Sequence, residues 1–189
     1  NSSLAALIAS CERYNLSVTF LRLITDAPAY VIGAVVSDPT HTPTFGLGFC
    51  AHADAHIAAE KALIEALRSR VHTRMRLAQT EKTKKTTRTT ARDRSVYWAL
   101  NERWKSLAFL IEGETLPLTR EPWKNAEPST HLEHIRLWCV RNAYELTSVS
   151  LSQSQANRTP WHIEYTVIPQ LQPMHLDEHN PCTGGIRLR

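Results

Sequence analysis

The sequence is poor in the features that mark membrane, secreted and zinc-binding proteins. No apolar run approaches the roughly 20 residues of a membrane-spanning helix, and the N-terminus has neither the basic start nor the long apolar core of a signal peptide. None of the four cysteines belongs to a CxxC pair, which disfavours a zinc site or a disulfide framework. We therefore expect buried free thiols and a cytoplasmic setting without membrane contact.

Other absences limit the chemistry. The sequence contains no HExxH pattern, no Walker phosphate-binding spacing and no three-glycine dinucleotide fingerprint. His52 and His56 have the spacing of helical zinc ligands, but they straddle a predicted strand-to-helix junction. Asp54 between them is better explained as the N-cap of the helix. A metal site is therefore disfavoured here.

Positive charge is concentrated in one segment of a chain whose formal net charge is +4. Residues 68–94 carry ten basic and two acidic residues, a local balance of +8, and the remainder balances at −4. Within this segment, residues 79–92 (QTEKTKKTTRTTAR) have no apolar face and predict a mobile basic surface loop. Three interpretations of its charge stay open: a solvated loop, guidance of an acidic leader peptide or nucleotide, and RNA binding. The absence of aromatic residues disfavours nucleic acid.

Apolar periodicity predicts an α/β (α+β) fold in which mixed or antiparallel sheets pack with amphipathic helices. We expect helices at 3–14, about 54–70, 95–104 and 129–144, and strands at 16–23, 29–36, 44–51, 146–151 and 161–168. The tail at 169–189 is rich in Pro, His and Gly and is predicted to be irregular.

The order helix, strand, turn, strand occurs twice, at 4–36 and at 132–168. Three pairs of residues are 128 positions apart: Cys11 and Cys139, Val18 and Leu146, and Leu23 and Leu151. Pro28 and Pro160 are 132 positions apart, as a longer second turn would give. The pattern predicts two related helix–strand–strand units with their sheets packed together. Chance similarity stays open, because this arrangement is common.

The most informative segment is 46–70 (GLGFCAHADAHIAAEKALIEALRSR). Gly46 and Gly48 lie in a strand that leads into an Ala-rich helix, an arrangement that can present backbone N–H groups to an anion. Within the helix, Glu65 follows Lys61 by four residues and precedes Arg68 by three. Physical chemistry alone predicts ordinary surface charge pairs at these spacings.

This segment resembles the YcaO family, in which a Gly-x-Gly strand leads into a helix of the form A-x-x-R-A-L-x-E-A-x-Q-x-R. The corresponding residues are Ala58, Lys61, Ala62, Leu63, Glu65, Ala66, Arg68 and Arg70. Three further stretches are similar to family runs in the same order: 16–39, 97–100 (YWAL) and 168–175 (IPQLQPMH). The resemblance identifies 1–189 as a single partial YcaO-like domain, the C-terminal half.

The chain also departs from the family pattern. Lys61 stands where the family usually has Arg, Arg68 where it usually has Gln, and Gln170 where it usually has Gly. The Ser-x-x-x-Glu-x-x-Glu-Arg type motifs that hold magnesium and ATP in the family are absent. We therefore expect no turnover unless a partner supplies the other half.

The resemblance implies an ATP- and Mg²⁺-dependent enzyme that phosphorylates backbone amide oxygens of a ribosomally made precursor peptide, giving azolines or thioamides. It implies a cofactor site of Gly46, Gly48, Lys61, Glu65 and Arg68, with Glu65 orienting the metal or the nucleotide. Its partners would be the precursor peptide and a protein that supplies the N-terminal half or recognises the leader. The alternative is a non-catalytic or split YcaO-like chain that binds a precursor peptide or partner protein. The nucleophile, sulfur or oxygen, and the number of assembled chains stay open.

Overall fold

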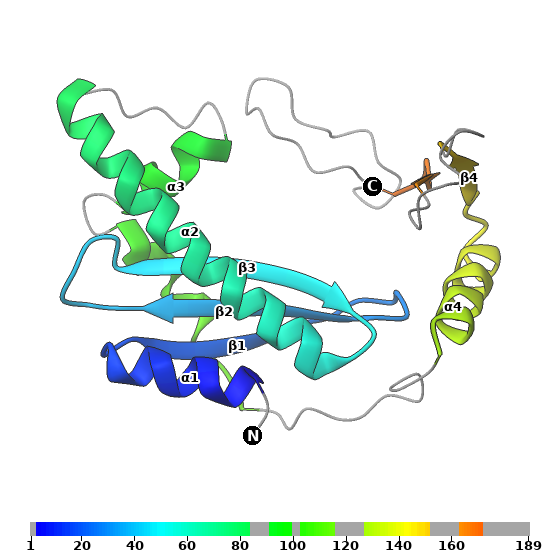
Figure 1. Cartoon of the computed structure of the whole chain (residues 1–189), viewed down its shortest axis with the longest axis horizontal. Coiled ribbons are helices and arrows are strands. Elements are labelled where there is room, and N and C mark those ends of the chain that lie inside the picture. The colour runs from blue at the N-terminus through cyan, green and yellow to red at the C-terminus, as the bar shows by residue number, and fades with distance from the viewer. Residues whose placement is uncertain (1–2, 84–90, 100–102, 116–126, 152–162, 172–189) are drawn as a thin grey trace, which may run out of the picture.

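The computed structural model describes residues 3–83, 91–99, 103–115, 127–151 and 163–171 (Figure 1). It confirms the expected fold class of helices and antiparallel sheets. The elements are α1 (Ser3–Arg13), β1 (Ser17–Leu23), β2 (Tyr30–Ser37), β3 (Phe45–His52), α2 (Ala55–Thr83), α3 (Ala91–Ala99), the 3-10 helix η1 (Arg103–Leu110), α4 (Pro128–Arg141), β4 (Thr147–Ser150) and β5 (Glu164–Val167). No helix in the described part of the chain has the length and apolar content needed to cross a membrane.

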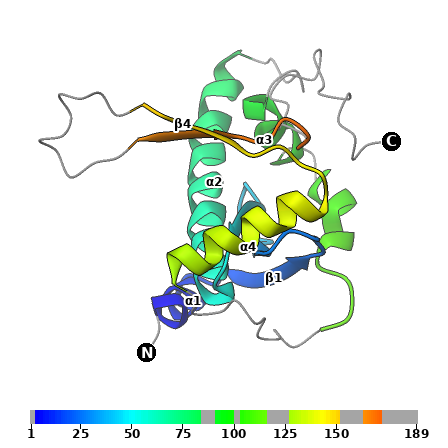
Figure 2. The same cartoon turned by 90° about the vertical axis from the view of Figure 1, so that its right-hand side faces the viewer.

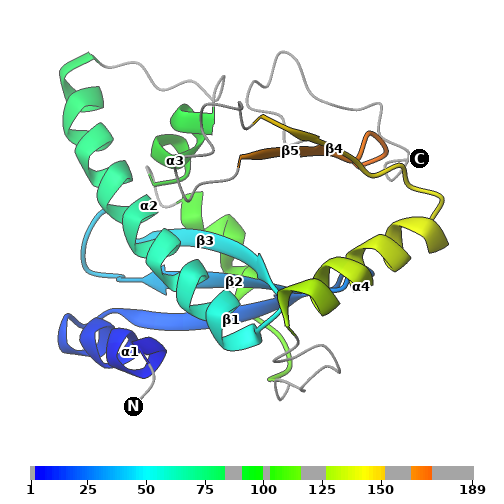
Figure 3. The same ribbon diagram turned by 45° about the vertical axis from the view of Figure 1, so that its right-hand side comes forward.

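The main core lies between two helices and one face of a three-stranded antiparallel sheet of order β1–β2–β3. Figures 1 and 3 show α1 and α2 on the same face of this sheet. Because side chains alternate along a strand, every second residue of β2 points toward these helices, and Ile32, Ala34 and Val36 are buried there. The helix α2 meets them mostly with alanines, at positions 55, 58, 59, 62 and 66. Small side chains on the helix permit a close approach to the sheet.

Two glycines of β3 make that approach closer still. A Cβ atom on Gly46 would lie 2.4 Å from the carbonyl oxygen of Ala66. A Cβ atom on Gly48 would lie 2.3 Å from both the Ala62 oxygen and the Ala66 nitrogen. These are backbone atoms of α2, which cannot turn away as a side chain can. The Gly-x-Gly pattern therefore sets the distance between α2 and the sheet.

A largely buried ion pair joins α2 to the connection between β2 and β3. Arg70 of α2 donates from Nη2 to Oδ2 of Asp38 (2.7 Å) and from Nε to the carbonyl of Pro43 (3.2 Å). Asp38 also accepts hydrogen bonds from the Thr40 amide (3.0 Å) and the Thr40 hydroxyl (2.6 Å). The Thr40 hydroxyl is the main cause that lowers the pKa of Asp38 to about 2, with further help from His41 and Arg70 against the effect of burial. The β2–β3 connection is thereby tied to the middle of α2.

The two helix–strand–strand units share backbone geometry as well as order. Each first helix is followed by a residue with positive φ, Asn15 at 55° and Ala143 at 54°. Each helix is then closed by the same six-residue hydrogen bond, from Leu16 N–H to Cys11 O (3.0 Å) and from Tyr144 N–H to Cys139 O (2.8 Å). This is a Schellman-type helix end, and it recurs at the offset of 128 found in the sequence.

The hairpins agree in register too. Thr19 pairs with Val35 in the first hairpin, and Thr147 pairs with Val167 in the second. The first members of these pairs differ by 128 and the second members by 132, so the second hairpin has the same register with a longer turn. These shared contacts support the two related units. The expected packing of their sheets is not found: every residue of β4 and β5 is exposed, and the pair lies apart from the first sheet (Figures 2 and 3).

The expected basic loop at 79–92 is wrong at both ends. The helix α2 continues to Thr83, and α3 already begins at Ala91, while residues 84–90 lie outside the described chain. The expectation relied on the missing apolar face, but Gln79, Glu81, Lys82, Ala91 and Arg92 are residue types with high intrinsic helix propensity. Leu77 of α2 also packs in a small core with Val96 and Ala99 of α3. The expected helix at 95–104 ends at Ala99, and η1 follows; most of the expected irregular tail, from residue 172, lies outside the described residues.

We predict that Gly48→Ala lowers the free energy of unfolding by roughly 2 kcal/mol, because the new methyl group overlaps the backbone of α2. Urea denaturation followed by circular dichroism measures the change. Gly33→Ala is the matched control, since its methyl group meets the Phe49 ring at 2.9 Å and that half-exposed side chain can move. An equal loss in both variants would contradict the packing role of Gly48.

We predict that the Asp38 carboxylate makes stability depend on acid. Its pKa in the folded chain, about 2, lies below the ordinary value of 3.8, so its contribution is complete above pH 4 and is lost as pH falls toward 2. Between these limits the unsubstituted chain should lose about 2 kcal/mol more than Asp38→Asn does. Urea titrations at several pH values test this, with the exposed Glu133→Gln as control. Parallel pH profiles of the parent chain and Asp38→Asn would refute it.

Candidate functional site

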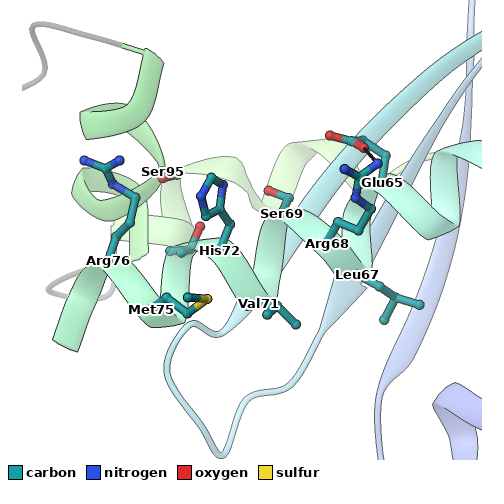
Figure 4. A pocket seen from close by; sticks show the side chains of 10 residues that line it. Glu65, Leu67, Arg68, Ser69, Val71, His72, Met75, Arg76 and Ser95 are labelled. Carbon is teal, nitrogen blue, oxygen red and sulfur yellow. Dashed lines mark ion pairs between the residues drawn. The ribbon is translucent and has the colours of Figure 1, made fainter. Parts of the chain in front are cut away.

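A cavity of about 680 Å³ lies beside the outer part of α2, and Ser95 of α3 forms part of its wall (Figure 4). The charged and imidazole side chains that line it are Glu65, Arg68, His72 and Arg76. These residues recur every three or four positions, so they form one row along the helix. Figure 4 shows His72 and Arg76 near Ser95, whereas Leu67 and Val71 point to the opposite side of α2.

Glu65 and Arg68 form an ion pair across this surface. The distance from Oε2 to Nη1 is 3.6 Å, and the side chains are 54% and 77% exposed. A pair this exposed adds little to stability, because water screens it and both side chains lose freedom in making it. The two groups can therefore turn to a ligand at little cost to the fold. The sequence-based charge pair is confirmed, while its role toward a cofactor stays a prediction.

The five predicted cofactor residues do not share one surface. Glu65 and Arg68 line the cavity, and Lys61 lies one turn earlier on α2, exposed but outside the cavity lining. Gly46 and Gly48 are buried beneath α2, where they contact its backbone. They position the helix that carries the cavity, and the buried face leaves them no surface for a ligand.

The N-terminus of α2 also differs from an anion site. Oδ1 of Asp54 accepts hydrogen bonds from the amides of His56 (2.7 Å) and Ile57 (3.3 Å). This confirms the predicted N-cap, and it places a carboxylate where a bound anion would need free N–H groups. The expected presentation of N–H groups to an anion after the Gly-x-Gly strand is therefore corrected: the chain caps this helix itself.

The residues fit phosphate better than they fit magnesium. Arg68, His72 and Arg76 supply cationic or hydrogen-bonding groups along one cavity wall. Glu65 is the one carboxylate in that wall, whereas Mg²⁺ usually takes several oxygen ligands. Across the described ranges, no three His, Cys, Asp or Glu side chains gather closely enough to hold a metal ion. A magnesium site that used Glu65 would therefore need further ligands from outside this wall.

None of the three described cysteines lines this cavity. Cys11 and Cys139 are buried, as expected, and Cys50 is partly buried; all three are free. Burial raises the pKa of the Cys11 thiol, which disfavours the reactive thiolate. Cys182 lies outside the described residues.

Sequence reasoning missed His72 and Arg76, which lie beyond the family-like motif, and the Asp38–Arg70 pair, whose members are 32 residues apart. The helical repeat is the signal for the first two, because His72 and Arg76 follow Arg68 by four and eight positions. No local pattern announces the ion pair. The Asp-Pro-Thr sequence at 38–40 indicates only a turn in which the aspartate bonds to the following backbone.

Comparison with known proteins agrees with the fold. A heterocyclase solved in complex with substrate and cofactor is similar with a TM-score of 0.63 and 16% identity over 88% of this chain. The heterocyclase TruD is similar with a TM-score of 0.61 and 14% identity over 90% of the chain. The chain spans only about a fifth of each structure, 21% and 22%. A search of curated protein sequences gave no match.

These low identities establish the likeness of fold and no more. The family assignment has a separate basis in the sequence itself. The model of the family described as YcaO cyclodehydratase, ATP- and Mg²⁺-binding, matches residues 1–172. That range includes both helix–strand–strand units and the whole of α2. The chain belongs to the YcaO family.

Proposed function

We propose that this chain forms one wall of the nucleotide site of a YcaO enzyme that phosphorylates backbone amide oxygens in a ribosomally made peptide, giving azolines or thioamides. The observation that carries the proposal is the row of Glu65, Arg68, His72 and Arg76 in one cavity, on the side of α2 that does not pack on the sheet. The family description, which names ATP and Mg²⁺, supports the choice of ligand.

The chemistry needs a strong electrophile because an amide oxygen is a poor leaving group. In the proposed reaction a side-chain or external nucleophile adds to the amide carbon, and the resulting oxyanion takes the terminal phosphoryl group of ATP with release of ADP. The oxygen then leaves as phosphate, a good leaving group. Arg68 and Arg76 hold the phosphates through charge-assisted hydrogen bonds, and His72 between them adds a further ring N–H donor. Glu65 would be the one residue of this wall able to hold the magnesium ion, and doing so would release Arg68 to the phosphates.

The peptide that is modified, and a protein that supplies the remaining magnesium ligands or recognises the leader, complete the proposed system. Heterocyclases among the structural neighbours support a peptide substrate of this class. The buried free thiols Cys11 and Cys139 support a reducing compartment, so we place the enzyme in the cytoplasm.

A second candidate function follows from the single carboxylate in the cavity wall. A chain with cationic groups and one carboxylate suits binding of anionic groups better than catalysis with magnesium. It would then act as a split or non-catalytic YcaO chain that binds a precursor peptide or a partner protein. ATP binding with and without turnover separates the two functions.

We predict that Arg68→Ala and Arg76→Ala each weaken ATP binding to the full chain about tenfold, because each removes a charge-assisted contact to phosphate. Isothermal titration of ATP with Mg²⁺ measures the dissociation constants. Arg136→Ala is the matched control: Arg136 pairs with Glu133 at the same i, i+3 spacing on another exposed helix, at 2.7 Å. Its affinity should equal that of the unsubstituted chain.

Two outcomes would contradict the nucleotide site. Equal affinities of Arg68→Ala and Arg136→Ala would mean that the cavity does not hold the phosphates. Absence of ATP binding to the unsubstituted chain, combined with binding of a precursor peptide, would favour the second candidate function. Phosphate release that appears only after a carboxylate-bearing YcaO partner is added, and that Glu65→Gln abolishes, would establish the enzyme.

A further inference from the structure

The outer edge of β5 is open in the described part of the chain. The second sheet consists of β4 and β5 alone, so β5 has one partner strand. The carbonyl of Ile163 accepts a hydrogen bond from the Leu151 amide (2.8 Å), which shows that Ile163 faces β4. Because successive residues of a strand face opposite edges, Glu164 and Thr166 direct their backbone N–H and C=O groups to the open edge.

The first unit shows what the same edge can hold. There, the amide of Asp38 donates to the carbonyl of Thr44 (2.7 Å), and alternate residues of β2 face β3 in the same way. Ala34, which pairs with Gly48 of β3, precedes Thr166 by the offset of 132 that relates the two hairpins. Among the described residues, the edge that β2 fills with a third strand is thus the edge at which β5 has no partner strand.

The open edge borders an apolar face. The side chains on this face are 36% to 60% exposed: Val149, Leu151, Ile163, Tyr165 and Val167. The opposite face is polar, with the Ser148 hydroxyl 3.3 Å from Oε2 of Glu164 and 3.1 Å from the Thr166 hydroxyl. A lone two-stranded hairpin is marginally stable in water, and a third strand with apolar side chains would extend both the backbone ladder and the apolar face.

We propose that the open edge of β5 binds an extended peptide segment of another polypeptide as a third strand. The segment carries apolar side chains at alternate positions, which lie beside Tyr165 and Val167, and polar side chains at the positions between. Its backbone bonds to Glu164 and Thr166, as β3 bonds to β2. This inference does not depend on the nucleotide chemistry proposed above.

The sequence favours another polypeptide as the source. In the first unit the third strand, β3, is Phe45–His52, and the offset of 132 that relates the two hairpins puts the corresponding residues at 177–184. The residues in the corresponding place, 177–184 (DEHNPCTG), lie outside the described chain; they contain Pro181 and no apolar alternation, unlike FGLGFCAH of β3.

The test uses a capped, fluorescently labelled peptide of alternating threonine and valine, with binding to the full chain followed by fluorescence anisotropy. Two further peptides carry N-methyl groups on alternate amides, on one edge or on the other. Strand addition uses only one edge of the peptide, so one methylated peptide should lose at least about tenfold in affinity and the other should bind within about twofold.

A pair of protein variants locates the site. Thr166→Pro removes the N–H that faces the open edge and leaves the bonds to β4 in place, so peptide binding should fall at least about tenfold. Thr166→Val is the control, because it keeps the N–H and loses only the hydroxyl near Ser148. Chemical shifts of the β4 amides report whether each variant keeps the hairpin. Arg68→Ala should bind the peptide normally, which separates this test from that of the nucleotide site.

Three results would overturn the proposal. Equal binding of the two methylated peptides would show an apolar contact without a strand ladder. Equal binding by the proline and valine variants would place the peptide elsewhere. Light scattering could also show a dimer. If Thr166→Pro dissociates this dimer and the peptide does not, the edge binds a second copy of this chain.

Discussion

The contact between α2 and the glycines of β3 is the constraint on which the rest of the structure depends. Because Gly46 and Gly48 have no side chains, the backbone of α2 lies directly on the strand, and most of the helix face above the sheet consists of alanines. This burial leaves the opposite face to charged residues, among them Glu65 and Arg68. The Asp38–Arg70 pair then fixes the helix along its own length. The packing of one face of α2 on the sheet therefore fixes the position of the cavity beside the other face.

The two helix–strand–strand units have matching backbone hydrogen bonds but different surfaces. In the first hairpin, the face that carries Ala34 is apolar and covered by helices. The equivalent face of the second hairpin carries Thr166 and Glu164, and its apolar side chains lie on the reverse face. A helix like α2 has no apolar surface to pack against there. The matching hydrogen bonds to the carbonyls of Cys11 and Cys139 thus occur in two units whose sheet surfaces differ.

The sequence predicted the strands closely because alternation of apolar residues depends on local geometry: β1, β2 and β3 begin within one residue of their expected positions. It failed where distant contacts decide. The end of α2 depends on intrinsic propensity and on packing between Leu77 and Val96, which have no local apolar pattern. A Gly-x-Gly strand before a helix looks the same in sequence whether the glycines bind an anion or allow close packing of the helix backbone. The packing role of Gly48 is therefore visible only in the three-dimensional structure.

The positive charge of the cavity wall favours phosphate binding and disfavours magnesium binding. Arg68 and Arg76 are suited to phosphate oxygens, but their positive charge repels a magnesium ion unless carboxylates outnumber it. Glu65 is shared with Arg68, so it neutralises little of that charge. A second surface that carries carboxylates would correct this balance and would bury the cavity from water, which strengthens each charge interaction. Under the proposed function, catalysis therefore requires an interface, and the side of α2 that carries Glu65, Arg68 and Arg76 is the surface that the interface must cover.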